Sequence, residues 1–194
     1  VRPRLEARTL RGLDWDNFTS MRTRVGLLAR LDDRISIFAQ LQDVRIWGGE
    51  TSTVDFSADG FDLHQGYLDL GFGDDESELS GFFRAGRQEV NLGGQRLVGA
   101  VGWLQQGRSF DGVRIRSEWR GHALDMLGSK ISENSVQIQD LTADFLSAYG
   151  VLDLSRFGSL DLYWMFLGRS ATETPYGGEH TFGAAESIRE PLGE

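Results

Sequence analysis

The feature that most constrains the fold of this chain is a recurring alternation of apolar and polar residues without a helical period. Over residues 21–31 the odd positions are almost all apolar, whereas the even positions include Arg22 and Arg24. Successive side chains of a β-strand point to opposite faces. This segment therefore predicts a strand with one apolar and one arginine-bearing face. Residues 34–42 repeat the pattern after an Asp-Asp pair, which predicts a hairpin.

Similar alternation, less regular elsewhere, recurs along the whole chain. The connectors alternate between short turns and longer loops, and several segments have the roughly 9–11 residues that a tilted membrane strand requires. The sequence therefore predicts an all-β fold, an antiparallel up-and-down meander of about ten strands that is part of a larger transmembrane β-barrel. The expected strands cover residues 1–10, 21–31, 34–42, 61–72, 79–90, 112–119, 122–132, 144–154, 160–167 and 180–186.

The tryptophans fit the same interpretation. Trp15, Trp47, Trp103 and Trp119 fall at strand ends or in loops, and only Trp164 falls in the middle of an expected strand. Aromatic girdles at the two interfaces of a membrane have this placement. The alternative is that these side chains cap the core of a soluble sheet.

Composition excludes several classes of function. The formal charge of −9 argues against nucleic-acid binding, and the absence of cysteine excludes disulfides, thiolate metal sites and a cysteine nucleophile. His64, His122 and His180 lack metal-ligand spacing, and the acidic run 74–78 lacks the glycine and ligand spacing of a calcium loop. No nucleophile–base pair is visible, so we expect no enzymatic activity and no cofactor.

Almost all basic residues of the chain are arginines. Lys130 is the only lysine among 20 basic residues. Arginine is a permanently charged donor that binds carboxylates through two parallel hydrogen bonds. Arginines on the polar faces of several strands predict a water-filled lumen lined by guanidinium groups. For any single strand, the alternative is an ordinary solvated face.

One block of sequence is distinctive. Gly-Arg-Gln-Glu at 86–89, Gln-Arg-Leu-Val-Gly at 95–99 and Phe-Asp-Gly-Val-Arg at 110–114 follow the strand segment 64–70 in close succession. This block resembles the alginate-export family of outer-membrane porins. The resemblance implies a barrel of about eighteen strands that exports an anionic polysaccharide across a Gram-negative outer membrane.

The long connector 91–109 is rich in glycine and contains Arg96 and Arg108. Such a loop can fold inward and narrow a wide lumen, where fixed guanidinium groups would attract carboxylates. The alternative reading is that Arg87, Asp111 and Arg114 form a salt-bridge network that braces the wall. The expected pore-lining residues are Arg22, Arg24, Gln65, Tyr67, Arg87, Arg96, Arg108, Asp111, Arg114 and Arg116.

We expect residues 1–194 to form a single domain, the N-terminal portion of a barrel that stops before closure, because residues 183–194 do not resemble a closing strand. The expected function is passive passage of anionic solutes, with uronate polysaccharide as the implied class. The expected partners are outer-membrane lipid and the anionic solute, and the full-length barrel is expected to be monomeric. The alternative is a soluble or surface β-protein that binds acidic glycans through the same arginine-bearing face.

Overall fold

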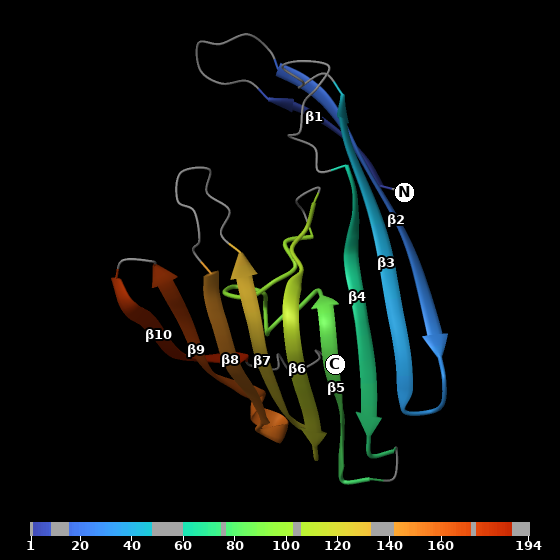
Figure 1. Cartoon of the computed structure of the whole chain (residues 1–194). Helices are drawn as coiled ribbons and strands as arrows, with labels where there is room; N and C mark the ends of the chain where they lie inside the picture. The colour runs from blue at the N-terminus through green and yellow to red at the C-terminus, as the bar shows by residue number, and fades with distance from the viewer. Residues whose placement is uncertain are drawn as a thin grey trace, which may run out of the picture.

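Ten antiparallel strands form one sheet whose spatial order follows the chain from β1 to β10 (Figure 1). The computed structural model describes residues 2–8, 16–47, 60–74, 77–102, 106–132, 142–171 and 174–187. The strands are β1 (Arg2–Arg8), β2 (Asp16–Arg30), β3 (Ile35–Trp47), β4 (Phe61–Phe72), β5 (Leu79–Gln88), β6 (Phe110–Trp119), β7 (His122–Ser132), β8 (Thr142–Asp153), β9 (Ser159–Ala171) and β10 (Thr174–Ser187), with a 3₁₀ turn at Ser155–Phe157. The expected all-β meander is confirmed.

Several strands are longer than the alternation of the sequence predicts. β2 begins at Asp16 because it pairs with β1 as far as Arg8. β3 extends to Trp47 because its ladder with β2 continues through the pair Thr19 and Trp47. Backbone hydrogen bonds between neighbours maintain a strand where its side-chain pattern has become irregular. Trp15 and Trp103 lie outside the described residues, as does the side chain of Trp47, so the aromatic girdle stays a prediction for them.

The two faces of the sheet differ as expected. Val25 and Leu27 are 67% and 73% exposed, and Ile37, Val113, Ile115 and Leu162 are exposed with them on the outer face. Arg22 and Arg114, on the opposite inner face, are each only 8% exposed. A row of large apolar side chains on the outside and buried polar groups on the inside is the reverse of a soluble domain, and it is the arrangement of a lipid-facing barrel wall.

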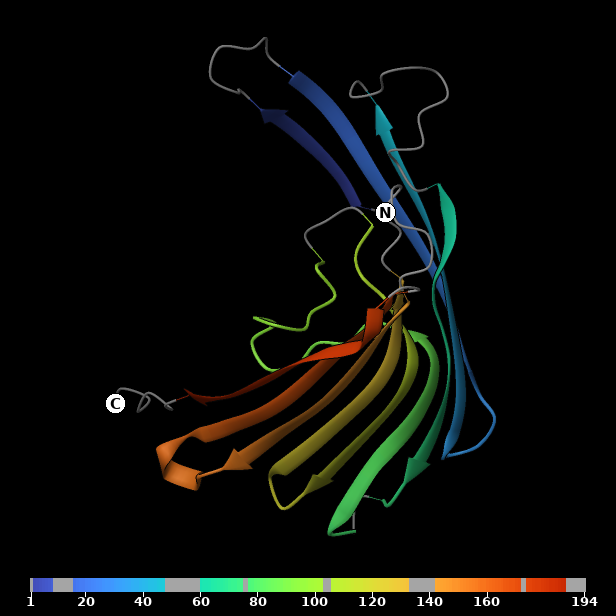
Figure 2. The same ribbon diagram turned by 60° about the vertical axis from the view of Figure 1, so that its left-hand side comes forward.

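The sheet curves strongly, so the inner face is concave (Figure 2). Among the described residues β1 pairs only with β2, and β10 pairs only with β9, so the sheet is not closed and has two free edges. The expectation that residues 1–194 are one domain interrupted before closure stays a prediction. The described residues include no helix long and apolar enough to cross a membrane.

The apolar core lies on the concave side, where the chain between β5 and β6 folds back over the sheet (Figure 2). We call this segment the inner loop; the structure describes its residues 89–102 and 106–109. Val90, Leu92 and Val98 of the inner loop are almost fully buried. They pack against side chains of β6 to β9, namely Phe110, Leu127, Phe145, Tyr149 and Met165.

Candidate functional site

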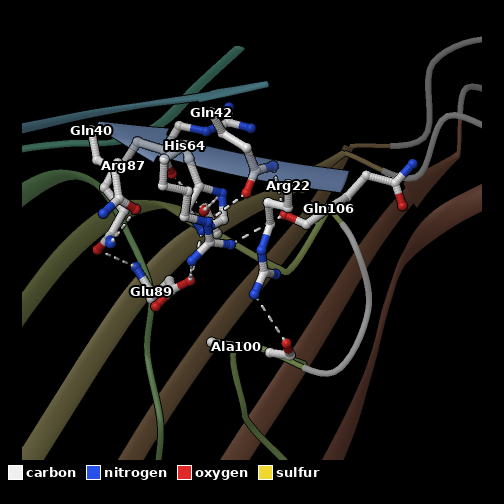
Figure 3. Close-up of polar contacts among 12 residues, drawn as sticks. Arg22, Gln40, Gln42, His64, Arg87, Glu89, Ala100 and Gln106 are labelled. Atoms are coloured by element: carbon white, nitrogen blue, oxygen red, sulfur yellow. Dashed lines mark hydrogen bonds and ion pairs between the residues drawn. The ribbon is translucent and has the colours of Figure 1, made fainter. Parts of the chain in front are cut away.

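The inner loop is attached by polar contacts to the part of the wall formed by β2, β3 and β4 (Figure 3). Arg24 on β2 donates from Nε to Gln42 Oε1 at 2.6 Å and from Nη1 to Glu89 Oε1 at 2.9 Å. Gln42 on β3 in turn donates to the carbonyl of Gln106 at 2.8 Å. Arg22, two residues before Arg24 on β2, donates from its guanidinium group to the carbonyl of Gly102 at 3.3 Å. Both ends of the inner loop are therefore fixed to the same wall.

A β-bulge completes this attachment. Gln40 pairs with Gln65 and Leu41 pairs with Leu63, which leaves His64 as an extra residue on β4. A bulge redirects the side chain of the extra residue. The His64 ring, almost completely buried, lies 2.6 Å from Glu89 Oε1 through Nε2, and the Ser109 hydroxyl donates to the His64 carbonyl at 2.6 Å.

Glu89 lies just beyond the end of β5, and its carboxylate receives two of these contacts. The hydrogen bond from His64 lowers the pKa of the Glu89 carboxyl, and the charge and hydrogen bond of Arg24 add to this effect against the opposing desolvation. Because this pKa is lowered, the ionised Glu89 carboxylate stabilises the attachment of the inner loop fully above its ordinary pKa of 4.5. This stabilisation is lost as the pH falls through the lowered pKa.

We therefore expect the attachment of the inner loop to be independent of pH near neutrality and to weaken only in acid. Hydrogen exchange of the Arg108 amide, which donates to the Ala100 carbonyl inside the loop, measures this once corrected for the intrinsic rate at each pH. In the wild type, protection should fall only below the ordinary carboxyl pKa of 4.5, whereas Glu89→Gln should show weaker protection with no such step. A wild-type step at pH 6–7 would contradict this assignment.

On its other side the inner loop is held by apolar packing and one close backbone approach. Gly93 has φ +51°, and a Cβ at this position would lie 2.0 Å from the Tyr149 hydroxyl on β8. Only glycine allows this backbone conformation and this approach together. Because polar contacts hold the loop to β2–β4 and apolar contacts hold it to β6–β9, the loop spans the concave face.

The alginate-export family model matches residues 3–184, almost the whole chain. The chain belongs to the alginate-export family. A comparison with curated proteins found no match. The all-β fold, the outward apolar face and membership of a transport family together support an outer-membrane β-barrel that serves export, and the family is not one of enzymes.

In this alginate-export chain, most inward arginines are paired with carboxylates. Arg114 binds both oxygens of Asp125, with Nε at 2.9 Å from Oδ1, and both residues are buried. Arg84 binds Asp69 through two hydrogen bonds of 2.6 and 2.7 Å. Arg116 binds Glu118 at 2.8 Å and approaches Asp125 at 3.4 Å. The positive charge of the inner face is therefore largely neutralised.

These carboxylates are the functional residues that the sequence analysis missed. Asp69 stands opposite Arg84, and Asp125 stands opposite Arg116, in the registers of their strand pairs. Opposite charges on adjacent expected strands are the signal that could have found them. The sequence analysis had no register to apply, and a shift of one residue would have sent each side chain to the other face.

The remaining predicted site residues do not form one cluster but lie at separate points of the sheet. Arg87 contacts Asp111 at 3.2 Å, so this part of the expected brace is present. Asp111 and Arg114 are three residues apart on β6 and point to opposite faces, so Arg114 is not part of it. Gln65 accepts a hydrogen bond from the Glu89 amide at 3.2 Å, and the Arg84 guanidinium lies 3.7 Å above the Tyr67 ring.

Arg96 and Arg108 are exposed on the inner loop. Within the part of the chain that the structure describes, neither has a carboxylate within ion-pair distance. They differ in this from Arg24, Arg84 and Arg114, whose charges are matched. The same part of the chain holds no group of three acidic or histidine side chains arranged to bind a metal ion.

Proposed function

We propose that this chain forms the wall and the constriction of an outer-membrane export channel, in which Arg96 and Arg108 guide an anionic polysaccharide past the inner loop. The observation that carries the proposal is the position of that loop. It spans the concave face, is fixed at both sides, and leaves Arg96 and Arg108 exposed, while Arg24, Arg84 and Arg114 on the wall are paired with carboxylates. Passage is then confined to the space that the loop leaves free.

Charge at a narrow point has a large effect on selectivity because a charge in a confined space is poorly screened. A paired guanidinium contributes little net electric field to the lumen. The pairs formed by Arg114 with Asp125 and by Arg84 with Asp69 therefore mainly stabilise the wall. The two loop arginines contribute the positive field of the constriction. A soluble glycan-binding protein is disfavoured as the alternative, because the outer face exposes a continuous row of large apolar side chains.

Reversal potentials of the protein in planar bilayers test this proposal. We expect the wild-type channel to prefer anions and the double variant Arg96→Gln/Arg108→Gln to lose most of that preference. Glu78→Gln is the control, since Glu78 lies at the turn before β5 and is more than half exposed. Charges farther from the path than the Debye length of about 8 Å are largely screened. A double variant that inserts and retains the preference would refute the role of these arginines.

A further inference from the structure

An apolar groove lies on the outer face of the sheet, at the end where a short turn joins β6 to β7 (Figure 1). We call it the outer groove. Its volume of about 610 Å³ is within the range of about 300–1,000 Å³ that is typical of small-molecule sites. Its walls are large apolar side chains that are each more than a third exposed, namely Leu79, Trp119, Leu124 and Leu152.

The outer groove is hollow because two small residues form its floor. Leu124 on β7 pairs with Ser117 on β6 and with Gly150 on β8, so a small residue lies on either side of it. A Cβ added at Gly150 would lie 3.9 Å from the nearest atom, the carbonyl oxygen of Leu162. The space above Gly150 is therefore open, and a larger side chain at this position would occupy the groove without a clash.

At the end of the sheet the outer groove continues into a second cavity, of about 360 Å³, that is surrounded by charged side chains. The two cavities share Glu78, Trp119 and His122. Arg120, in the turn between β6 and β7, lines the second cavity. The combined site is thus apolar along the outer face and charged at its end.

The charged end offers hydrogen-bond donors to a further anion. The Asp153 amide donates to His122 Nδ1 at 3.1 Å, so the neutral His122 ring carries its proton on Nε2 and can donate from there. Arg120 binds Glu78 through one guanidinium nitrogen, Nη2, and the guanidinium lies 5.6 Å from the centre of the Trp119 ring. A guanidinium group has several further N–H donors, so Arg120 can bind a second anion while it keeps this contact.

This arrangement fits a phospholipid whose headgroup carries both a phosphate and an ammonium group. One acyl chain would occupy the outer groove, and the phosphate would accept hydrogen bonds from Arg120 and His122. The ammonium group would donate to the carboxylate of Glu78. Trp119 would lie at the boundary between acyl chain and headgroup, where tryptophan is enriched in membrane proteins.

We propose that the outer groove binds one molecule of a zwitterionic phospholipid, with its acyl chain above Gly150 and its phosphate at Arg120 and His122. The proposal rests on the proposed function, because it requires the outer face to lie in a membrane. Short turns of outer-membrane barrels lie on the periplasmic side, so the lipid would belong to the periplasmic leaflet. The site is on the opposite face of the sheet from the inner loop, and it would fix the lower end of β5–β8 in the bilayer.

Native mass spectrometry of the full chain in detergent micelles that contain phosphatidylethanolamine tests this proposal. Diacylglycerol with the same acyl chains is the second probe, because it lacks the headgroup. The wild type should retain one phosphatidylethanolamine and bind it at least tenfold more tightly than diacylglycerol. Gly150→Leu fills the outer groove without changing any charge, and it should lower the affinity for phosphatidylethanolamine about tenfold or more.

Gly128→Leu is the matched control for Gly150→Leu. Gly128 lies on the same outer face, between Val113 and Leu146, and outside the outer groove. A Cβ at this position would lie 3.4 Å from the Leu146 side chain, which is ordinary van der Waals contact. This variant should therefore retain the wild-type affinity for both lipids.

Arg120→Asn is the second variant, and it decides the question if Gly150→Leu does not fold. Arg120 has φ +47° and precedes Gly121, and Asn-Gly is a favoured pair in two-residue hairpin turns, so the turn should be kept. The variant removes the guanidinium group, and it should reduce the preference for phosphatidylethanolamine over diacylglycerol about tenfold.

Two results would overturn the lipid site even if the protein inserts and prefers anions. One is wild-type affinity for phosphatidylethanolamine in both Gly150→Leu and Arg120→Asn. The other is a wild type that retains no phosphatidylethanolamine, which would instead favour an apolar segment of a partner protein as the occupant. A wild-type channel without anion preference would refute the proposed function, so the two failures are distinguishable.

Discussion

Replacing Asp125 with alanine is expected to destabilise the sheet by about 3–5 kcal/mol, because it leaves a buried guanidinium without its counter-charge. Asp125 is 2% exposed and Arg114 is 8% exposed, and three hydrogen bonds join them across adjacent strands. Arg116 approaches the same carboxylate and would lose that contact as well. The free energy of unfolding in a detergent–urea series measures the effect.

Two further variants separate the cost of an unpaired charge from the value of the pair itself. Glu118→Ala removes a carboxylate that binds only one arginine and is more than half exposed, so it should cost no more than about 1 kcal/mol. The double variant Arg114→Met/Asp125→Leu replaces both charges with apolar groups and should recover most of the loss of Asp125→Ala. If Asp125→Ala lowers the free energy of unfolding no more than Glu118→Ala does, the pair of Arg114 and Asp125 does not stabilise the sheet.

Replacing Glu89 with alanine is expected to release the inner loop from β2–β4 and to increase single-channel conductance. The change removes the carboxylate that Arg24 and His64 both contact, at 2.9 and 2.6 Å. Each charge-assisted hydrogen bond contributes about 1.5–3 kcal/mol, and the loss of one shifts the equilibrium between held and released loop by tenfold or more. The apolar contacts to β6–β9 remain, so the loop should stay attached on that side.

Conductance and current noise in planar bilayers measure this release. Glu78→Ala is the control, since its carboxylate binds Arg120 at an exposed turn and makes no described contact with the inner loop. Conductance and noise should increase for Glu89→Ala and should be unchanged for Glu78→Ala. If Glu89→Ala has wild-type conductance and noise, the polar contacts to β2–β4 do not set the width of the passage.

The sequence by itself determined the fold class, the order of the strands and the direction of most side chains. The period-two alternation is a local property of the chain, since each residue of a strand points opposite to the one before it. It therefore placed Val25 and Arg24 on the correct faces before any contact was known. The distinctive motifs around residues 86–114 indicated the family, which the match over residues 3–184 confirms.

Only the tertiary structure decided which charges meet. Arg24 and Glu89 are 65 residues apart, and their contact depends on the registers of three strand pairs and on the path of the inner loop. The bulge that leaves His64 unpaired on β4 shifts one of these registers, and no residue pattern within β4 reveals it. The arginines that the sequence indicated as a charged lining are consequently mostly paired, and the outer groove exists because the registers of β6, β7 and β8 bring Ser117 and Gly150 to either side of Leu124. Such juxtapositions depend on separations across the sheet, and the periodicity of a single strand contains no information about them.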